Sequence, residues 1–387
     1  MNKKLRIMKG FILILTSLLI LMSCVTQKPI LNSIPDEDNF ATIFYCIHDN
    51  SINLNKSALY ELKSFGKTNP SQSNGTEIEN SSVVFSEYPL GRYDYSYRLL
   101  PSISNDGKYI VKAVDDFKVI DISFNRNIEI HLVNTENGNT EKFNVTLPIL
   151  EYGEEKYQLP WSEKNNSFFG VIDDSLFRFS EGQNSQMLLY RPNLYDFKIS
   201  PLENFAVVFA DDSLFLFEFQ TKDFILVQEV GRVLGINPKY IRGINWFPDE
   251  SKFIFAEGST IYIYSISDHS LSEFSIGDKV FDVEWVDKNN LICVTGDYPD
   301  DLSHMRTSGR YRIMTFNINT GELEVIHRRL NHEPFTVKPK ISPSKKLILF
   351  SEKPHNAPYQ VKLMSLDGLN ESVLAEGFLP FWAFRSK

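Results

Sequence analysis

The chain is poor in the residues that build many enzyme sites. It has three cysteines and seven histidines in 387 residues, so it is not a disulfide scaffold, and its histidines lack the spacing of metal ligands. It contains no glycine-rich phosphate loop, no G-x-S-x-G elbow, no H-E-x-x-H and no C-x-x-C. These absences predict a protein that is not an enzyme and has neither a cofactor nor a metal site.

Positive charge is also scarce. Lys and Arg number 40 against 49 Asp and Glu, which gives a formal charge of -9 and argues against nucleic-acid binding. One acidic stretch, Asp297 to Asp301 followed by His304, could hold a cation, although loops of this composition are commoner without one. The hydrophobic share of 42% is enough to bury a large core.

No hydrophobic run is long enough to cross a membrane as a helix. The longest, Phe11 to Met22, covers about a dozen residues, whereas a bilayer core of roughly 30 Å needs about 20. Lys3, Lys4, Arg6 and Lys9 precede it. A basic segment followed by a short apolar run is typical of an export signal.

The residues after this run are Leu21-Met22-Ser23-Cys24, and they resemble the lipobox of bacterial lipoproteins. The resemblance implies cleavage before Cys24 and acylation of its thiol, as by palmitate, so that the mature chain is held on a membrane by lipid. Val25 stands where Asp would indicate retention in the inner membrane, which favours the outer membrane. We therefore expect a signal peptide at 1–23, a lipidated cysteine and tether at 24–39, and one domain at 40–387.

That domain has no convincing amphipathic helix. It consists of runs of four to eight residues rich in Val, Ile, Phe and Tyr, separated by Asn, Asp, Gly, Ser and Pro, which predicts strands and turns throughout. An apolar residue, a turn and a strand recur seven times, and the key apolar residues are Ile103, Trp161, Ile199, Trp246, Trp285, Ile341 and Trp382. A four-stranded propeller blade needs about 40 residues, which is close to the shorter intervals between these positions.

The repeats resemble those of TolB-type propellers, most closely at Asp106-Gly107-Lys108 and Pro248-Asp249. The resemblance implies an all-β fold, and counting first strands predicts a seven-bladed β-propeller. The last copy of the repeat has only its first strand. At the amino end, three strands are expected without a first strand, at Thr42–Ile47, Ala58–Lys63 and Ser82–Ser86. Together these four strands would form one blade and close the ring. Six blades, eight blades or an irregular β-sandwich remain open.

In this arrangement Cys46 and Cys293 lie in different blades, so we expect no disulfide between them. Turns between first and second strands are short and emerge at one end of the ring. Second-to-third loops and blade-to-blade loops emerge at the other end, where they are longer and rich in Tyr and Arg, residues suited to binding. The candidate ligand-binding face comprises Arg92, Tyr93, Tyr95, Arg98, Arg191, Tyr195, Tyr240, Arg242, Arg328 and His332. Arg329, beside Arg328, belongs to the same stretch.

The sequence thus predicts a non-enzymatic propeller scaffold, anchored in the bacterial cell envelope through Cys24, that binds a protein, a peptide or a glycan. Two alternatives remain. A structural spacer would have no ligand. A hydrolase or lyase with an active site on the axis would need carboxylates or histidines that converge on the central channel, whereas the first strands offer Ile, Trp, Ser and Pro.

Overall fold

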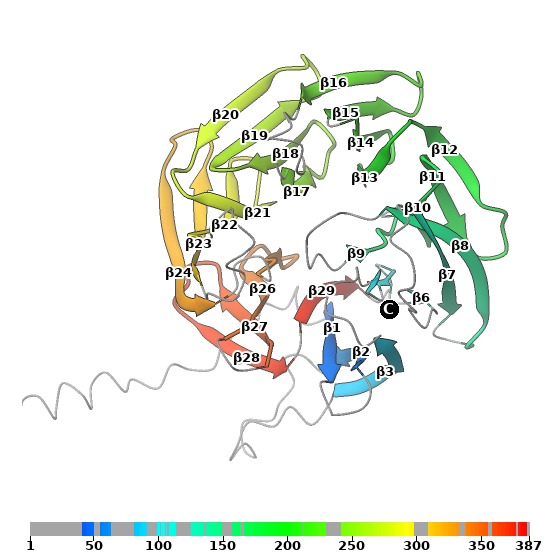
Figure 1. Cartoon of the computed structure of the whole chain (residues 1–387). Coiled ribbons are helices and arrows are strands. Elements are labelled where there is room, and N and C mark those ends of the chain that lie inside the picture. The colour runs from blue at the N-terminus through cyan, green and yellow to red at the C-terminus, as the bar shows by residue number, and fades with distance from the viewer. Residues whose placement is uncertain are drawn as a thin grey trace, which may run out of the picture.

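The structure is a computed structural model of the whole chain (Figure 1). It describes residues 41–49, 55–62, 81–90, 99–100, 102–104, 106, 108–113, 125–134, 137–148, 157–162, 164, 166–211, 213–229, 241–297, 309–332, 337–354, 358–376 and 378–384. The predicted signal peptide, Cys24 and the predicted tether lie outside these ranges. Every regular element within them is a strand, and no helix that could cross a membrane occurs there.

Apart from one parallel pair and the sheet that joins the two ends of the chain, the strands form antiparallel sheets in chain order. Four blades follow one another without a crossover: β13 (Leu194–Ile199) to β16 (Phe224–Glu229), β17 (Ile241–Trp246) to β20 (Leu271–Ser275), β21 (Lys279–Trp285) to β24 (Leu323–His332), and β25 (Lys340–Ile341) to β28 (Glu371–Glu376). Their middle strands are β14 (Phe205–Ala210), β15 (Ser213–Glu218), β18 (Lys252–Glu257), β19 (Thr260–Ser265), β22 (Asn290–Asp297), β23 (Gly309–Asn317), β26 (Leu347–Glu352) and β27 (Gln360–Ser365). An earlier blade contains β5 (Ser102–Ile103), β6 (Tyr109–Ala113), β7 (Asn125–Asn134) and β8 (Thr140–Pro148).

The sheets stand around a common axis, with each first strand on the inside and each fourth strand at the rim (Figure 1). The two ends of the chain share one blade. β29 (Phe378–Phe384) pairs with β1 (Ala41–Asp49), in the order β29-β1-β2-β3 with β2 (Asn55–Leu62) and β3 (Ser81–Leu90). The predicted closure, with one strand from the carboxyl end and three from the amino end, is confirmed.

The number of blades differs from the prediction. Within the described ranges, six sheets have four strands, so the propeller has six complete blades and not seven. The sheet expected as the remaining blade has only β10 (Ser167–Ile172), β11 (Ser175–Ser180) and β12 (Gln186–Tyr190).

The first strand of that sheet is reduced to a single bridge between Trp161 and Phe168. Pro160 has no N–H to donate to the ladder, although its carbonyl accepts the Phe169 N–H at 2.9 Å. The residues just before it, β9 (Tyr157–Gln158), pair in parallel with β4 (Leu99–Leu100) instead. The repeat therefore marks the position of this sheet correctly but overestimates its strand count.

The tryptophans of the repeat fix the register between neighbouring sheets. The indole N–H of Trp161 donates to Ser102 Oγ at 3.1 Å. Those of Trp246 and Trp285 donate to the carbonyls of Lys198 and Asn245, at 3.1 and 3.3 Å. Each acceptor residue immediately precedes the key apolar residue of the preceding unit. The tryptophan that marks a unit in the sequence therefore also bonds that unit to its neighbour.

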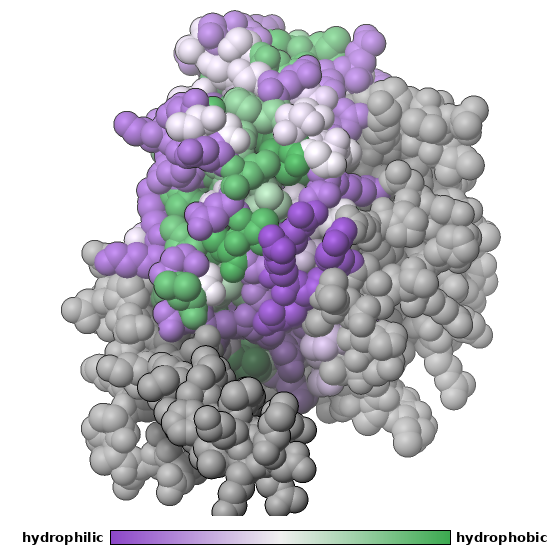
Figure 2. Space-filling model, turned by 90° about the vertical axis from the view of Figure 1, so that its left-hand side faces the viewer, coloured by the Kyte–Doolittle hydropathy of each residue, from purple (hydrophilic) through white to green (hydrophobic). Residues whose placement is uncertain are grey.

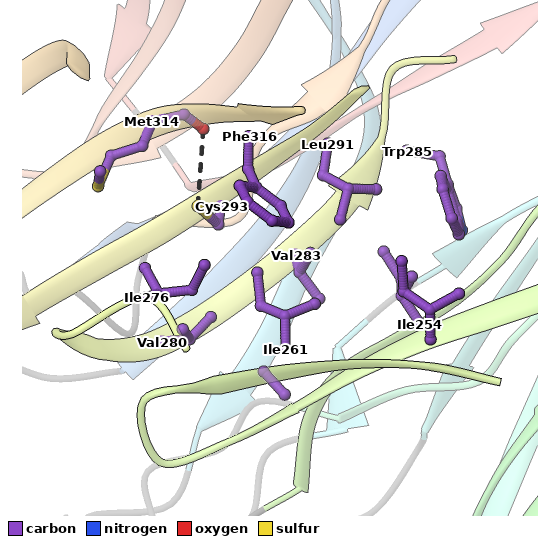
Figure 3. Close-up of a cluster of buried hydrophobic side chains, with 12 residues drawn as sticks. Ile254, Ile261, Ile276, Val280, Val283, Trp285, Leu291, Cys293, Met314 and Phe316 are labelled. Atoms are coloured by element: carbon purple, nitrogen blue, oxygen red, sulfur yellow. Dashed lines mark hydrogen bonds between the residues drawn. The ribbon is translucent and has the colours of Figure 1, made fainter. Parts of the chain in front are cut away.

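The core lies between the sheets. In Figure 3, Ile254 and Ile261 of one blade pack against Val283, Leu291 and Phe316 of the next. Cys293 belongs to this cluster as a free thiol, as predicted, and its Sγ lies 3.7 Å from the carbonyl oxygen of Met314. Burial raises the pKa of this thiol to about 12, so it stays protonated and unreactive at neutral pH.

Burial falls from the inner strands to the rim. The central residues of β18 are buried, whereas β20 of the same blade has only half-buried and exposed residues. The side of the ring that carries β20 and β24 accordingly shows hydrophobic residues as a band bordered by hydrophilic ones (Figure 2). The apolar contacts that stabilise the ring are therefore concentrated near its centre.

Candidate functional site

The two ends of the ring differ, as the strand order predicted. We call the end that carries the first-to-second turns the turn face. Its turns bind one another: Asn204 Nδ2 donates to Glu250 Oε2 at 2.8 Å, and Lys252 Nζ donates to the carbonyl of Lys288 at 2.9 Å. Both contacts join neighbouring blades, which leaves short, mutually bonded turns on this face.

We call the opposite end the loop face. There the Arg191 N–H donates to the carbonyl of Asp174 at 3.0 Å, and the Val280 N–H donates to that of Gly258 at 2.8 Å. The first bond links a second-to-third turn to the following blade-to-blade connection, and the second links such a turn to the start of β21 in the next blade. The longer connections, residues 230–240 between β16 and β17 and residues 298–308 between β22 and β23, also begin and end here.

Arg191 is the predicted binding residue that the structure describes best, and it packs within its own blade. Its guanidinium lies 3.9 Å from the centroid of the Phe215 ring and 4.9 Å from that of Phe224. Asp211 Oδ2 lies 3.9 Å from the guanidinium. Contact with the faces of these two rings gives Arg191 a role in stability.

Several predicted loop residues belong to strands instead. Tyr195 lies in β13, Arg242 in β17, and Arg328 and His332 in β24, which continues to pair with β23 as far as His332. Of these four, Arg328 has a described side chain, and it is exposed. The side chains of the other three lie outside the described part of the structure, as do Arg92, Tyr93, Tyr95, Arg98 and Tyr240 and most of the acidic stretch after Asp297.

Arg329 belongs to a buried ionic network between the last two blades. Its Nε lies 3.1 Å from Glu352 Oε1, and its NH2 group lies 2.8 Å from Glu371 Oε2. Lys362 Nζ pairs with both of these carboxylates. Two cations therefore neutralise two carboxylates, and Glu352 is completely buried.

His327 and Tyr311 extend this network into the core. The Tyr311 hydroxyl lies 3.2 Å from His327 Nε2, and His327 Nδ1 lies 3.3 Å from Glu371 Oε2. Burial, assisted by the positive charge of Arg329, lowers the pKa of His327 to about 4, so the imidazole is neutral at pH 7. Tyr311 is fully buried. These side chains are thus sealed between two blades, and we assign the network to stability.

A second set of charges lies on the inner strands of the same two blades, except for Lys338, which precedes β25 by two residues. We call Asp282, Glu284, Lys338 and Lys340 the inner-strand cluster. Glu284 Oε2 on β21 accepts a bond of 2.7 Å from Lys340 Nζ on β25. Lys340 is half-buried, Lys338 is exposed, and Asp282 is 9% exposed. One first strand, β21, therefore carries two carboxylates in addition to the kinds of residue expected there.

The sequence does contain a signal for this cluster. Three residues before the key residues Ile199, Trp246, Trp285 and Ile341 stand, in order, Asp196, Gly243, Asp282 and Lys338, and one residue before them stand Lys198, Asn245, Glu284 and Lys340. The intervening Phe197, Ile244 and Val283 pack against the preceding sheet. Polar residues thus recur on the face of four successive inner strands that is opposite to the face packed against the preceding sheet.

The strand pairing defines the chain as an all-β propeller. Solved structures similar to it include TolB from Acinetobacter baumannii, at 15% identity over 91% of this chain and 69% of that chain, with a TM-score of 0.49. A proposed 6-phosphogluconolactonase from Bacteroides fragilis, at 14% identity, covers 90% of this chain and 100% of its own, also with a TM-score of 0.49. The chain matches no protein-family model and no curated protein. Likenesses at this level assign it no activity and no partner.

Proposed function

We propose that the chain is a non-enzymatic propeller scaffold, anchored by lipid at Cys24 in the bacterial cell envelope, that binds a protein, a peptide or a glycan on the loop face. The observation that supports this most is the contrast between the two ends of the ring. The turn face is closed by bonds between its short turns, whereas the longer connections begin and end on the loop face. Loops held by a rigid scaffold are where binding usually occurs.

The anchor has a direct chemical test. In cells fed an alkyne-labelled palmitate analogue, the wild-type protein is expected to become labelled, because Cys24 offers the thiol to be acylated. Cys24→Ser is expected to abolish labelling, whereas Cys293→Ser should retain it, because the Cys293 thiol is buried in the core. Labelling of the Cys24→Ser protein would contradict the lipoprotein proposal.

The loop face is tested by crosslinking in intact cells. The double variant Arg98→Ala, Arg242→Ala is expected to reduce recovery of a specific partner about tenfold. Removing an arginine that anchors an interface typically weakens binding by at least this factor. Arg191 is left unchanged because it packs within its blade. The matched control, Lys346→Ala, removes an exposed charge on the turn face and should leave recovery unchanged. Equal recovery from all three proteins, each with wild-type thermal unfolding, would favour a spacer without a ligand.

The inner-strand cluster favours a second candidate, a hydrolase or lyase acting on the propeller axis. Asp282 and Glu284 stand two residues apart on β21, and Lys340 faces them from β25. A buried carboxyl near a second carboxyl that pairs with a lysine is an arrangement that acid–base catalysis can use. Turnover of an ester or glycoside that Asp282→Asn abolishes would support this candidate over the scaffold.

A further inference from the structure

Two arginines stand side by side on the outer half of the blade formed by β21 to β24. Arg312 of β23 lies directly opposite Arg328 of β24 in the antiparallel register. On either side of Arg328, His327 and Arg329 contact Glu371 of the following blade. Because side chains alternate along a strand, Arg328 and its partner Arg312 are directed toward the preceding blade. Like charges directly opposite each other destabilise a sheet, so an anion between the two guanidinium groups would stabilise this blade.

The charge of this arginine pair is only partly neutralised. Asp278, in the connection between β20 and β21, accepts a bond from the NH2 group of Arg312. The Nε of Arg312 is buried without a hydrogen-bond partner, and the residue opposite it on β22, Thr295, is uncharged. Arg328 is exposed, and within the described residues its guanidinium has no ion pair. Two positive charges thus share one negative charge.

Apolar residues continue the same side of β24 toward the turn face. Val325 packs against the core cluster between this blade and the preceding one, as does Phe274 of β20. Leu323 lies opposite Phe316, a member of that cluster, and is 38% exposed. Figure 2 shows hydrophobic residues as a band on the side of the ring that carries β20 and β24. We call Arg312, Arg328 and Leu323 the rim surface.

We propose that the rim surface binds an extended acidic segment of a partner protein. One carboxylate of the segment lies between Arg312 and Arg328, where it accepts hydrogen bonds from both guanidinium groups. An apolar side chain of the segment covers Leu323, and this contact favours a peptide over a carboxylated glycan. Five residues separate Leu323 from Arg328, about 16 Å along a strand, so a segment of about six residues spans the surface.

This inference rests on the proposed scaffold function, and it names the class of partner and the place of contact. It requires neither the lipid anchor nor Arg98 and Arg242. Failure of the peptide to bind would therefore leave the scaffold to be decided by crosslinking in cells. Conversely, unchanged crosslinking in the Arg98→Ala, Arg242→Ala variant would not affect the rim surface.

The probe is a fluorescein-labelled peptide, Asp-Asp-Ser-Leu-Ser-Leu-Ser-Asp-Asp, whose two acidic ends allow it to lie along β24 in either direction. Its counterpart has Asn in place of each Asp. Binding to the full chain, purified in detergent, is measured by fluorescence anisotropy. We expect the acidic peptide to bind at least tenfold more tightly than the counterpart, and to bind more weakly as salt is added, because salt screens exposed charges.

Three variants locate the binding. Arg328→Gln is expected to weaken binding of the acidic peptide about tenfold, as for loss of one charge-assisted hydrogen bond. Leu323→Ser is expected to weaken it about threefold, because part of the apolar contact is lost. Lys346→Gln, which removes an exposed lysine from the turn face of the next blade, should bind like the wild type. All three positions are exposed, so the variants should keep the wild-type thermal unfolding.

The proposal is overturned if the acidic peptide and its counterpart bind alike, or if Arg328→Gln binds like Lys346→Gln. It is also overturned if polygalacturonate, an acidic glycan, displaces the peptide at a lower concentration of carboxylate than the unlabelled peptide does. That result would assign the surface to a glycan.

The chain's own acidic stretch is the rival for the two arginines. Asp297 stands opposite Arg310, two residues before Arg312 in β23. The double variant Asp300→Asn, Asp301→Asn is expected to bind the acidic peptide with wild-type affinity. If the peptide binds to this variant and not to the wild type, the arginines are paired within the chain and the proposal is overturned.

Discussion

Gly368→Ala is expected to destabilise the protein severely. Gly368 lies in the turn between β27 and β28 with a φ of +72°, and a Cβ there would stand 2.2 Å from the carbonyl oxygen of Ile326 in β24. That atom is backbone of the neighbouring blade and cannot move aside without shifting the strand. We expect a loss of about 4 kcal/mol in the free energy of unfolding, measured by urea denaturation.

The chain supplies a matched control in the corresponding turn of the preceding blade. Gly321 has a φ of +73°, and a Cβ there would meet nothing within 4 Å. Gly321→Ala is therefore expected to lose only about 1 to 2 kcal/mol of unfolding free energy, which is the cost of a left-handed backbone for a residue with a Cβ. The difference between the two variants isolates the contact with Ile326, and equal losses would show that the two blades do not approach each other this closely.

Glu352→Gln is expected to be the most damaging substitution in the ionic network between the last two blades. The carboxylate is fully buried and pairs with Arg329 and Lys362. Glutamine keeps the shape but leaves one carboxylate, Glu371, facing two cations. Removing one partner from a buried ionic set costs about 3 to 5 kcal/mol of unfolding free energy, measured by the same urea denaturation.

A double variant tests whether charge balance is the reason. Glu352→Gln combined with Lys362→Met leaves Arg329 and Glu371 as a neutral pair 2.8 Å apart. The loss is therefore expected to be smaller than the sum of the two single losses by about 2 kcal/mol. Strictly additive losses would mean that each side chain acts through its own packing and not through the shared network.

The repeat and the closure of the ring could be predicted from the sequence because their signals are local. A tryptophan or isoleucine before a short turn marks each unit, and that residue also contacts the preceding unit, as Trp246 and Trp285 do. The reduced first strand before β10 was missed because a key apolar residue is still present there. Pro160, one residue earlier, was the available signal.

The surroundings of individual side chains could not be predicted in the same way. Arg191 resembles a binding residue in the sequence, yet Phe215 and Phe224, which cover it, come from two later strands. Glu352, Lys362 and Glu371 likewise lie on three different strands, and only the packing of two blades brings them to Arg329. The inner-strand cluster was accessible in principle, because Asp196 and Asp282 occupy the same position of the repeat.

The pairing of β29 with β1 determines when the ring can close during synthesis. β29, the innermost strand of one blade, is the last of the described strands in chain order, and its partner β1 is the first. Until β29 has been synthesised, the earlier sheets can form but the ring stays open, with one edge of β1 unpaired. A ribosome stalled before the codon for Phe378 would therefore carry an open ring, and the unpaired edge of β1 could pair with a free strand of another chain.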